Sequence, residues 1–212
     1  MFKFSSNEIR DLFISFLVIS LAFSLLHIHG NFNLLADILP IVMVGVGLGF
    51  IFHEVAHKIT AMKYGHWAEY KTWPTGLFIA LVSSMFGFIF AAPGAVYISG
   101  QYIDDRQNGI ISIAGPLTNI ILSLIFLAGA IFLLMTVPLL SAPIMVAPDW
   151  AYILFMTCSI GFSINAVLAL FNLIPFSILD GAKVFRWDPI IWLVTAGFAG
   201  ILVFIAYSGA LI

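Results

Sequence analysis

Long runs of apolar residues, separated by short polar segments, dominate the chain. Five of these runs approach the ~20 residues that an α-helix needs to cross the hydrocarbon core of a bilayer. They cover residues 12–26, 40–64, 109–137, 150–174 and 189–207. The pattern predicts five transmembrane helices, and the second should start near Pro40 because proline is favoured in the first turn of a helix.

A sixth apolar stretch, from Leu77 to Ser99 (residues 77–99), is interrupted by glycines and a proline. It either crosses the membrane or dips into it and returns. If it returns, all eight Lys and Arg residues lie on one side, because the opposite loops, residues 27–39 and 138–149, contain none. If it crosses, the eight divide between the two sides. Since cytoplasmic loops carry an excess of Lys and Arg, the charges favour a re-entrant element.

Composition also points to a membrane protein. Of the 212 residues, 62% are hydrophobic and only 8% are charged, whereas soluble domains carry roughly 25% charged residues. So few charges cannot cover a soluble particle, and the apolar content is far above that of a disordered segment. The net charge of −2, without a basic run, argues against a nucleic-acid partner. We therefore predict an all-α integral membrane protein in which residues 1–212 form a single domain.

The second predicted helix contains His53-Glu54-Val55-Ala56-His57, an H-E-x-x-H pattern. Histidines four residues apart lie on one face of a helix, so both imidazoles can bind one metal ion. Glu54 lies beside them and can act as general base on water at that metal. Because ionisable side chains are costly inside a membrane span, this cluster is a candidate for function.

A catalytic zinc site usually has three protein ligands, so the two histidines need a third. Asp180 is the best candidate, because it lies in an apolar segment after the fourth predicted helix, where Pro175 should turn the chain back toward the bundle. A crossing segment at residues 77–99 would place Asp180 ~30 Å from the end of the His57 helix, whereas a re-entrant one keeps both on one side. Five of the other aspartates are assigned to far loops, a charged turn or a helix cap: Asp37, Asp149, Asp104, Asp105 and Asp188.

Several other residues are interpreted as structural rather than catalytic. The lone Cys158 excludes a disulfide framework and a cysteine-based zinc site, and it is expected to be a small packed hydrophobe. Gly115 and Pro116 indicate a kink with close packing, with a direct role in substrate binding as the alternative, and Asn119 and Asn165 are typical of interhelical hydrogen bonds. Three further histidines are expected to be solvated or interfacial: His27, His29 and His66.

These motifs resemble those of the site-2 proteases, a family of intramembrane zinc metalloproteases. Three segments match in order: the H-E-x-x-H run at residues 53–57, Ala-Gly-Pro-Leu-Thr-Asn at residues 114–119, and Asn-x-x-Pro-x-x-x-x-Asp-Gly from Asn172 to Gly181. The resemblance covers about residues 40–186, the expected catalytic core. It is closest to the short prokaryotic and archaeal members that lack PDZ and CBS domains.

The resemblance implies that His53, His57 and Asp180 bind one Zn²⁺ per chain and that Glu54 activates water. It also implies that Asn172 assists the substrate or the transition state. The expected activity is hydrolysis of peptide bonds within or near transmembrane segments of other membrane proteins, as in regulated intramembrane proteolysis. Many members carry proline where this chain has Ser177 and a second glycine where it has Ala182, so the loop before Asp180 is expected to differ in shape.

The distribution of Lys and Arg predicts a multi-pass protein of the cell membrane, with its N-terminus and active-site entrance cytoplasmic. Two other functions are compatible with a histidine pair in a membrane helix. One is a divalent-metal transporter, which would need further ligands along a path across the membrane. The other is an inactive, protease-like membrane scaffold. The oligomeric state and the identity of the substrate protein are left open.

Overall fold

The computed structural model describes residues 3–89, 93–100, 102–137 and 149–208. Within these residues, five helices are long and apolar enough to cross a membrane. They are α1 (Ser6–Ile28), α2 (Leu35–Lys63), α4 (Asp105–Thr136), α5 (Asp149–Asn172) and α7 (Pro189–Tyr207). Each overlaps most of one predicted apolar run, so the expectation of five long apolar helices is confirmed for the described residues.

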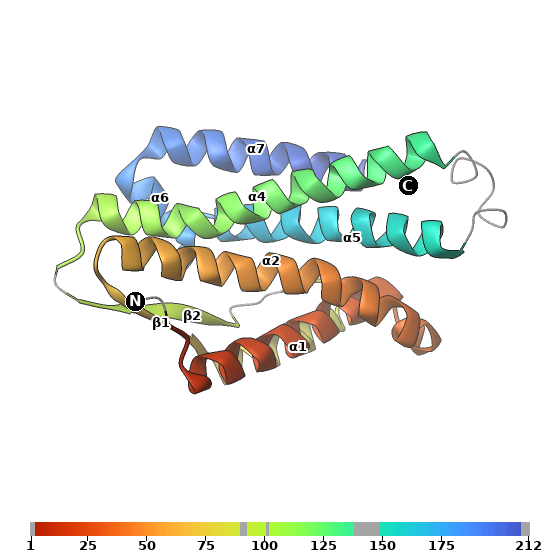
Figure 1. Cartoon of the computed structure of the whole chain (residues 1–212), viewed down its shortest axis with the longest axis horizontal. Helices are drawn as coiled ribbons and strands as arrows, with labels where there is room; N and C mark the ends of the chain where they lie inside the picture. The colour runs from red at the N-terminus through yellow and green to blue at the C-terminus, as the bar shows by residue number, and fades with distance from the viewer. Residues whose placement is uncertain (1–2, 90–92, 101, 138–148, 209–212) are drawn as a thin grey trace.

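Helix α2 lies at the centre of the bundle (Figure 1). It packs against α1 on one side and against α4 and α5 on the other, and α7 packs on α5. The contact between α2 and α5 is close, because a Cβ atom on Gly45 would lie 3.0 Å from the Cα of Gly161. Small residues let two helix backbones approach in this way. Cys158 of α5 is half-buried opposite Gly129 of α4, as expected of a packed hydrophobe.

The start of α2 differs from the sequence expectation. The sequence predicts Pro40 in the first turn, but a 3₁₀ turn (η1, Phe32–Leu34) leads directly into Leu35, and Pro40 lies inside the helix. In the second turn, the missing N–H of a proline leaves only one helical hydrogen bond unmade, that to the carbonyl of residue 36. The predicted boundary was therefore five residues late.

Between α2 and α4 the chain forms a strand, a short helix and a second strand: β1 (Trp67–Thr72), α3 (Pro74–Ser84) and β2 (Gly94–Ser99). The strands pair antiparallel, with Thr72 opposite Gly94, and the N–H of Trp73 donates to the carbonyl of Pro93 at 2.9 Å. The chain therefore leaves the sheet after Thr72 and comes back to the same end of it at Gly94.

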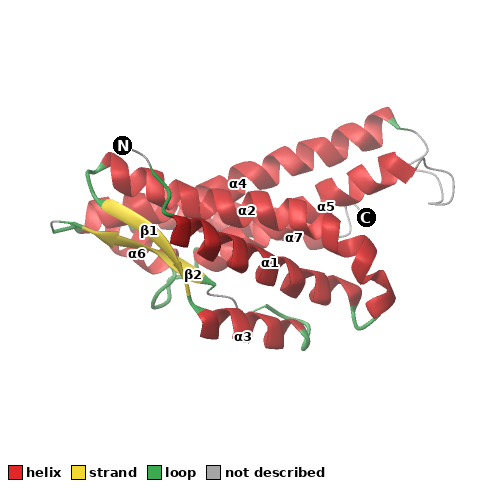
Figure 2. Cartoon of the chain, turned by 60° about the horizontal axis from the view of Figure 1, so that its bottom comes forward, coloured by secondary structure: helices red, strands yellow, loops and turns green. Residues whose placement is uncertain are grey.

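Helix α3 lies alongside α1, below the sheet in Figure 2. Its 11 residues span ~16 Å, about half the thickness of a bilayer core. The apolar stretch at residues 77–99 is thus the main part of a short helix followed by a strand, and residues 90–92 of it lie outside the described residues. The strand pair adds a small sheet to the helices that the sequence predicts.

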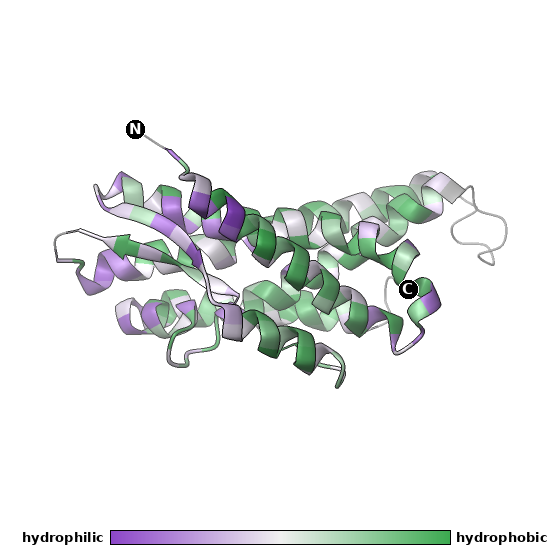
Figure 3. Ribbon diagram, turned by 90° about the horizontal axis from the view of Figure 1, so that it is seen from below, coloured by the Kyte–Doolittle hydropathy of each residue, from purple (hydrophilic) through white to green (hydrophobic). Residues whose placement is uncertain are grey.

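Polar residues gather at the end of the bundle that carries the sheet (Figure 3). The described Lys and Arg residues belong to the N-terminal segment and start of α1, the end of α2, β1, the start of α4, and α6 (Asp180–Trp187). Because the chain comes back to the sheet at Gly94, all these elements meet at one end (Figure 1). Of the loops expected at the other end without Lys or Arg, residues 138–148 lie outside the described part of the chain.

Candidate metal centre

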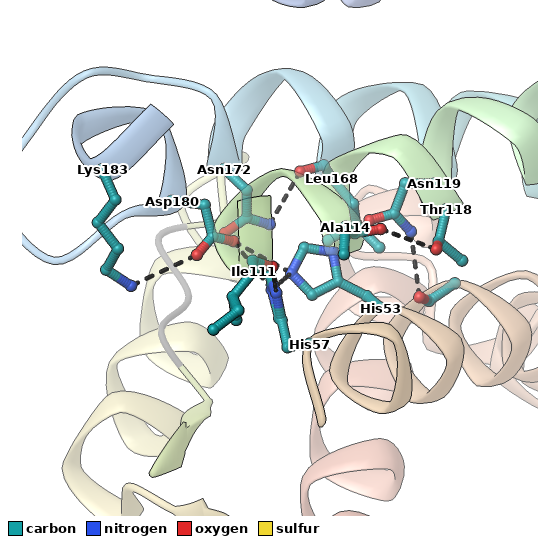
Figure 4. A network of polar contacts seen from close by, with 11 residues as sticks. His53, His57, Ile111, Ala114, Thr118, Asn119, Leu168, Asn172, Asp180 and Lys183 are labelled. Atoms are coloured by element: carbon teal, nitrogen blue, oxygen red, sulfur yellow. Dashed lines mark hydrogen bonds and ion pairs between the residues drawn. The ribbon is translucent and has the colours of Figure 1, made fainter. Parts of the chain in front are cut away.

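Two histidines from α2 and one aspartate from α6 bring their ligand atoms together inside the bundle (Figure 4). The Nε2 atoms of His53 and His57 are 3.0 Å apart. Oδ2 of Asp180 lies 3.1 Å from Nε2 of His57 and 3.4 Å from Nε2 of His53. All three side chains are buried. The structure therefore joins the three candidate ligands that the sequence singles out.

The spacing of these atoms fits a metal ion. In a tetrahedral zinc site with bonds of ~2.0–2.1 Å, the ligand atoms lie ~3.3–3.4 Å from one another. The three distances between the ligand atoms, 3.0, 3.1 and 3.4 Å, are close to that edge length. Two imidazole nitrogens and one carboxylate oxygen also form a donor set that zinc commonly takes.

Hydrogen bonds on the far side of each ring support the same conclusion. Nδ1 of His53 lies 2.6 Å from Oδ1 of Asn119, and Nδ1 of His57 lies 2.8 Å from the carbonyl of Ile111. Both partners are acceptors, so each Nδ1 carries the proton and donates. In a neutral ring the lone pair of Nε2 then faces the centre of the site, as in metal sites where a second partner orients the ligand.

The end of α5 explains how Asp180 reaches the histidines. Helix α5 ends at Asn172, and the loop of residues 173–179, which contains Pro175 and Ser177, turns the chain back into α6. A side chain on Gly181 would collide with the carbonyl of Leu173, so this glycine allows α6 to start against the end of α5.

Ser177 takes a left-handed backbone conformation with φ of 46°. Proline is restricted to φ near −65° and cannot adopt it. The loop therefore differs in shape from one with proline at this position, as expected, while Asp180 still reaches the site.

Glu54 and Asn172 share one cavity with the three ligand candidates. The cavity measures about 190 Å³ and is lined by residues of α1, α2, β2, α4, α5 and α6. Glu54 is buried beside His53 on α2. The side-chain amide of Asn172 donates to the carbonyl of Leu168 in its own helix at 2.9 Å, and Asn172 lies on the α5 side of the cavity (Figure 4). Both predicted catalytic residues are thus brought to the candidate metal centre.

Asp180 is held in its ionised form. Burial acts to raise the pKa of this carboxyl, but His57 and His53, when their imidazoles are protonated in the absence of a metal ion, outweigh burial and hold the pKa well below its usual range. The second oxygen, Oδ1, lies 3.5 Å from Nζ of Lys183 (Figure 4). The oxygen that faces the histidines is therefore available to a metal ion as a carboxylate ligand.

Two residues of α4, Asn119 and Gly115, contact the candidate metal ligands directly, which the sequence does not predict. Asn119 makes the expected interhelical bonds, donating from Nδ2 to the carbonyl of Gly49 and to Oδ1 of Asn165, but its Oδ1 also orients His53. A Cβ atom on Gly115 would lie 2.6 Å from Nε2 of His53, so Gly115 lets α4 pack directly on the rings. Their spacing of four residues, which places both on one face of α4, is the signal that links them.

Asp188 and His29 lie where the sequence predicts them, whereas Asp37 and Asp149 lie in the first turns of helices rather than in loops, and His27 is half-buried in the last turn of α1. Asp188 caps α7 by accepting the N–H of Ile190 at 2.9 Å and that of Ile191 at 3.0 Å. His29 is exposed. His66, however, was expected to be solvated or interfacial and is buried, with Nε2 3.3 Å from Oε1 of Gln107. The reason is that β1 starts directly after it and the chain that leaves β2 passes against the ring, since a Cβ atom on Gly100 would lie 2.7 Å from its Nδ1.

Proteins of known sequence show similarity over most of the chain. The chain is 42% identical over 193 residues, covering 91% of this chain and 90% of the relative, to "Putative zinc metalloprotease MJ0611" of Methanocaldococcus jannaschii. It is 29% identical over 161 residues, 70% of this chain and 68% of the relative, to "Putative zinc metalloprotease YwhC" of Bacillus subtilis. A shorter match, 29% identical over 101 residues, covers 41% of this chain and 38% of "Putative zinc metalloprotease Rip2" of Mycolicibacterium smegmatis. No protein-family model and no solved structure matches the chain.

Proposed function

Because this chain belongs to the site-2 protease family of zinc metalloproteases, we propose that it hydrolyses peptide bonds within or near transmembrane segments of other membrane proteins. The observation that carries this proposal is the convergence of Nε2 of His53, Nε2 of His57 and Oδ2 of Asp180 within a buried cavity that also holds Glu54. In this proposal the three side chains bind one Zn²⁺ per chain, and the protein is a multi-pass enzyme of the cell membrane.

Each residue of the cavity has a separate task in the proposed reaction. When bound, zinc polarises the scissile carbonyl and lowers the pKa of water at the site. The Glu54 carboxylate accepts a proton from the attacking water and passes it to the nitrogen of the leaving amine. The side-chain amide of Asn172 donates a hydrogen bond to the oxygen on which negative charge develops. The imidazoles stay fixed because their Nδ1 protons are held by Asn119 and Ile111.

The geometry of β2 supports binding of the substrate as an extended segment. A transmembrane helix hides its peptide bonds in its own hydrogen bonds, so it must unwind before hydrolysis. Gly94, Val96 and Ile98 of β2 line the cavity. We propose that residues 77–99 form a membrane re-entrant element and that the unwound substrate adds to β2 as a further strand.

The collection of Lys and Arg at the sheet end of the bundle supports an orientation with this end cytoplasmic. In that orientation the N-terminus and the entrance of the cavity face the cytoplasm. Asp180 starts α6, which carries Lys183 and Arg186 at the same end. Water can therefore reach the site from the cytoplasmic side without crossing the bilayer.

The test uses purified protein with a single-span membrane substrate. Replacing Glu54→Gln removes the general base but keeps the three ligand candidates, so the rate of cleavage should fall by about 10³-fold while zinc per chain stays unchanged. The matched control is Glu69→Gln, on β1, which should cleave within about threefold of the wild type. Equal cleavage by Glu54→Gln and wild type would contradict the mechanism. Zinc uptake into liposomes without cleavage would favour a transporter instead.

A further inference from the structure

Two carboxylates of α1 cover the outer edge of β1. The backbone N–H of Tyr70 donates to Oε1 of Glu8 at 3.1 Å, and the N–H of Thr72 donates to Oδ2 of Asp11 at 3.2 Å. An unpaired strand edge is a template for another strand. Since these carboxylates accept the N–H groups that such a strand would use, α1 closes this edge of the sheet.

The same bonds identify the groups that face outward on β2. In an antiparallel pair, residues whose N–H points away from the partner strand lie opposite residues that also point away. Tyr70 pairs with Val96 and Thr72 with Gly94, so the N–H and carbonyl groups of Val96 and Gly94 point to the other edge of β2. Both residues line the cavity. Among the described strands, that edge has no strand partner, so the sheet is closed toward α1 and open toward the candidate metal centre.

Glu8 also ties the sheet to the helix that carries the histidines. Its second oxygen, Oε2, forms an ion pair with Nζ of Lys58, the residue after His57 on α2. Glu8 is 1% exposed and Lys58 3% exposed, so little water screens this pair. A single carboxylate therefore connects β1 to α2 one residue away from a candidate zinc ligand.

Hydroxyl groups extend this connection along α1. The Tyr70 hydroxyl donates to Oγ of Ser15 at 2.9 Å, and Oγ1 of Thr72 donates to the carbonyl of Asp11 at 2.9 Å. Burial raises the pKa of Tyr70 well above its usual range, so its phenol stays a neutral donor. The alternate side chains of β1 are thereby fixed to one face of α1.

From these contacts we infer that Glu8 and Asp11, here called the α1 carboxylates, are positioning residues for substrate. They fix β1, and through it the open edge of β2, at a set place beside the candidate metal centre, and they keep an extended substrate off the edge of β1. This inference rests on the proposed function, in which the substrate adds to β2.

The test compares two replacements of Asp11 in the full chain. Asp11→Ala removes the acceptor of the Thr72 N–H, whereas Asp11→Asn keeps an oxygen that can accept it. The matched control, Arg10→Ala, removes the exposed partner of Asp11 but leaves the bond to β1. For each variant, KM and kcat are measured on a single-span substrate, together with zinc per chain and hydrogen exchange of residues 67–72 and 94–99.

For Asp11→Ala we expect KM to rise about tenfold, the effect of losing one charge-assisted hydrogen bond, with kcat within about threefold and zinc unchanged. Exchange should accelerate in both strands, and Asp11→Asn and Arg10→Ala should stay near the wild type. Glu8→Gln, which keeps an acceptor for Tyr70 but loses the charge paired with Lys58, should raise KM in the same way.

Unchanged exchange in both strands of Asp11→Ala would overturn the inference. So would a loss of zinc in proportion to the loss of cleavage, because that result indicates a general structural role. If the wild type cleaves no membrane substrate, the proposed function fails, and with it the part of the inference that concerns substrate. Hydrogen exchange then still decides whether the α1 carboxylates position the sheet.

Discussion

Two buried polar networks lie on opposite sides of α2, and they differ in charge. Toward α4 and α5 lies the amide network, formed by Asn119 and Asn165. Asn119 bonds His53, and Asn165 donates to the carbonyls of Gly45 and Gly161 at 3.3 and 2.8 Å. Toward α1 lies the charged network, formed by the α1 carboxylates with Lys58. The amide network reaches the candidate metal ligands, whereas the charged network reaches the sheet.

The position of each network along the bundle explains the difference. Asn119 and Asn165 lie within the long helices, where a charged group would be expensive and a neutral amide can satisfy backbone carbonyls of neighbouring helices. Glu8 and Asp11 lie in the first turns of α1, at the end of the bundle that collects the polar residues. The comparison teaches that metal binding and sheet position depend on different contacts, so substitutions should affect them separately.

The largest expected effect on zinc is that of Asp180→Ala. Removing one of three protein ligands should reduce zinc after dialysis against a chelator from about one per chain to nearly none, and cleavage should be lost with it. The measurement is zinc per chain by elemental analysis. Asp188→Ala is the control, because Asp188 caps α7 outside the site, and it should retain zinc. If Asp180→Ala retains full zinc and activity, the ligand assignment is wrong.

Gly115→Ala should have the next largest effect. The new Cβ would lie 2.6 Å from Nε2 of His53, and because interiors are close-packed, the ring or α4 must move. We expect zinc affinity to fall by about 100-fold or more, since a ligand atom itself is displaced. Gly200→Ala in α7 is the control, because its Cβ meets no heavy atom within 4 Å. Titration with a competing chelator measures both, and unchanged affinity in Gly115→Ala would show that α4 does not press on the site.

Asn119→Ala should weaken zinc binding by roughly 10–100-fold, as is usual when a residue that orients a metal-binding histidine is removed. Asn119→Asp keeps an oxygen that accepts the Nδ1 proton of His53, so it should retain more affinity than Asn119→Ala. The same chelator titration compares the two. Wild-type affinity in Asn119→Ala would mean that the amide network only holds helices together.

Lys58→Met should have the smallest effect on zinc and a clear effect on stability. It leaves the Glu8 carboxylate buried without its counter-charge, which costs about 3–5 kcal/mol, so the unfolding temperature should fall. Zinc affinity, measured well below that temperature, should stay within about threefold. The double variant Glu8→Gln/Lys58→Met should recover most of the stability. If Lys58→Met loses zinc affinity in proportion to its fall in unfolding temperature, the two networks do not act separately.

Much of this architecture could be predicted from the sequence, because the bilayer imposes a simple rule on length and polarity. The long helices follow from apolar runs, and the meeting of Asp180 with His53 and His57 follows from the one-sided distribution of Lys and Arg. That reasoning succeeded because the chain has few charged residues, and a membrane protein can place each of them at only a few positions. The expected return of residues 77–99 agrees with the pairing of Thr72 with Gly94.

The parts that could not be predicted depend on contacts between distant segments. The strands β1 and β2 are short and flank an apolar helix. The local sequence pattern therefore does not distinguish β1 from a polar loop, or β2 from part of an apolar membrane segment. The burial of His66 depends on that sheet. Nothing in the sequence near Glu8 indicates that its carboxylate would pair with Lys58, 50 residues later, and accept the N–H of Tyr70. Only the fold places these groups together.

The most direct test of the central claim is anomalous diffraction at the zinc absorption edge from crystals of the purified protein. We predict one peak in each chain, within about 2.0–2.2 Å of Nε2 of His53, Nε2 of His57 and a carboxylate oxygen of Asp180. The absence of a peak among these three atoms in zinc-loaded, catalytically active protein would contradict the account, as would a peak held by other residues.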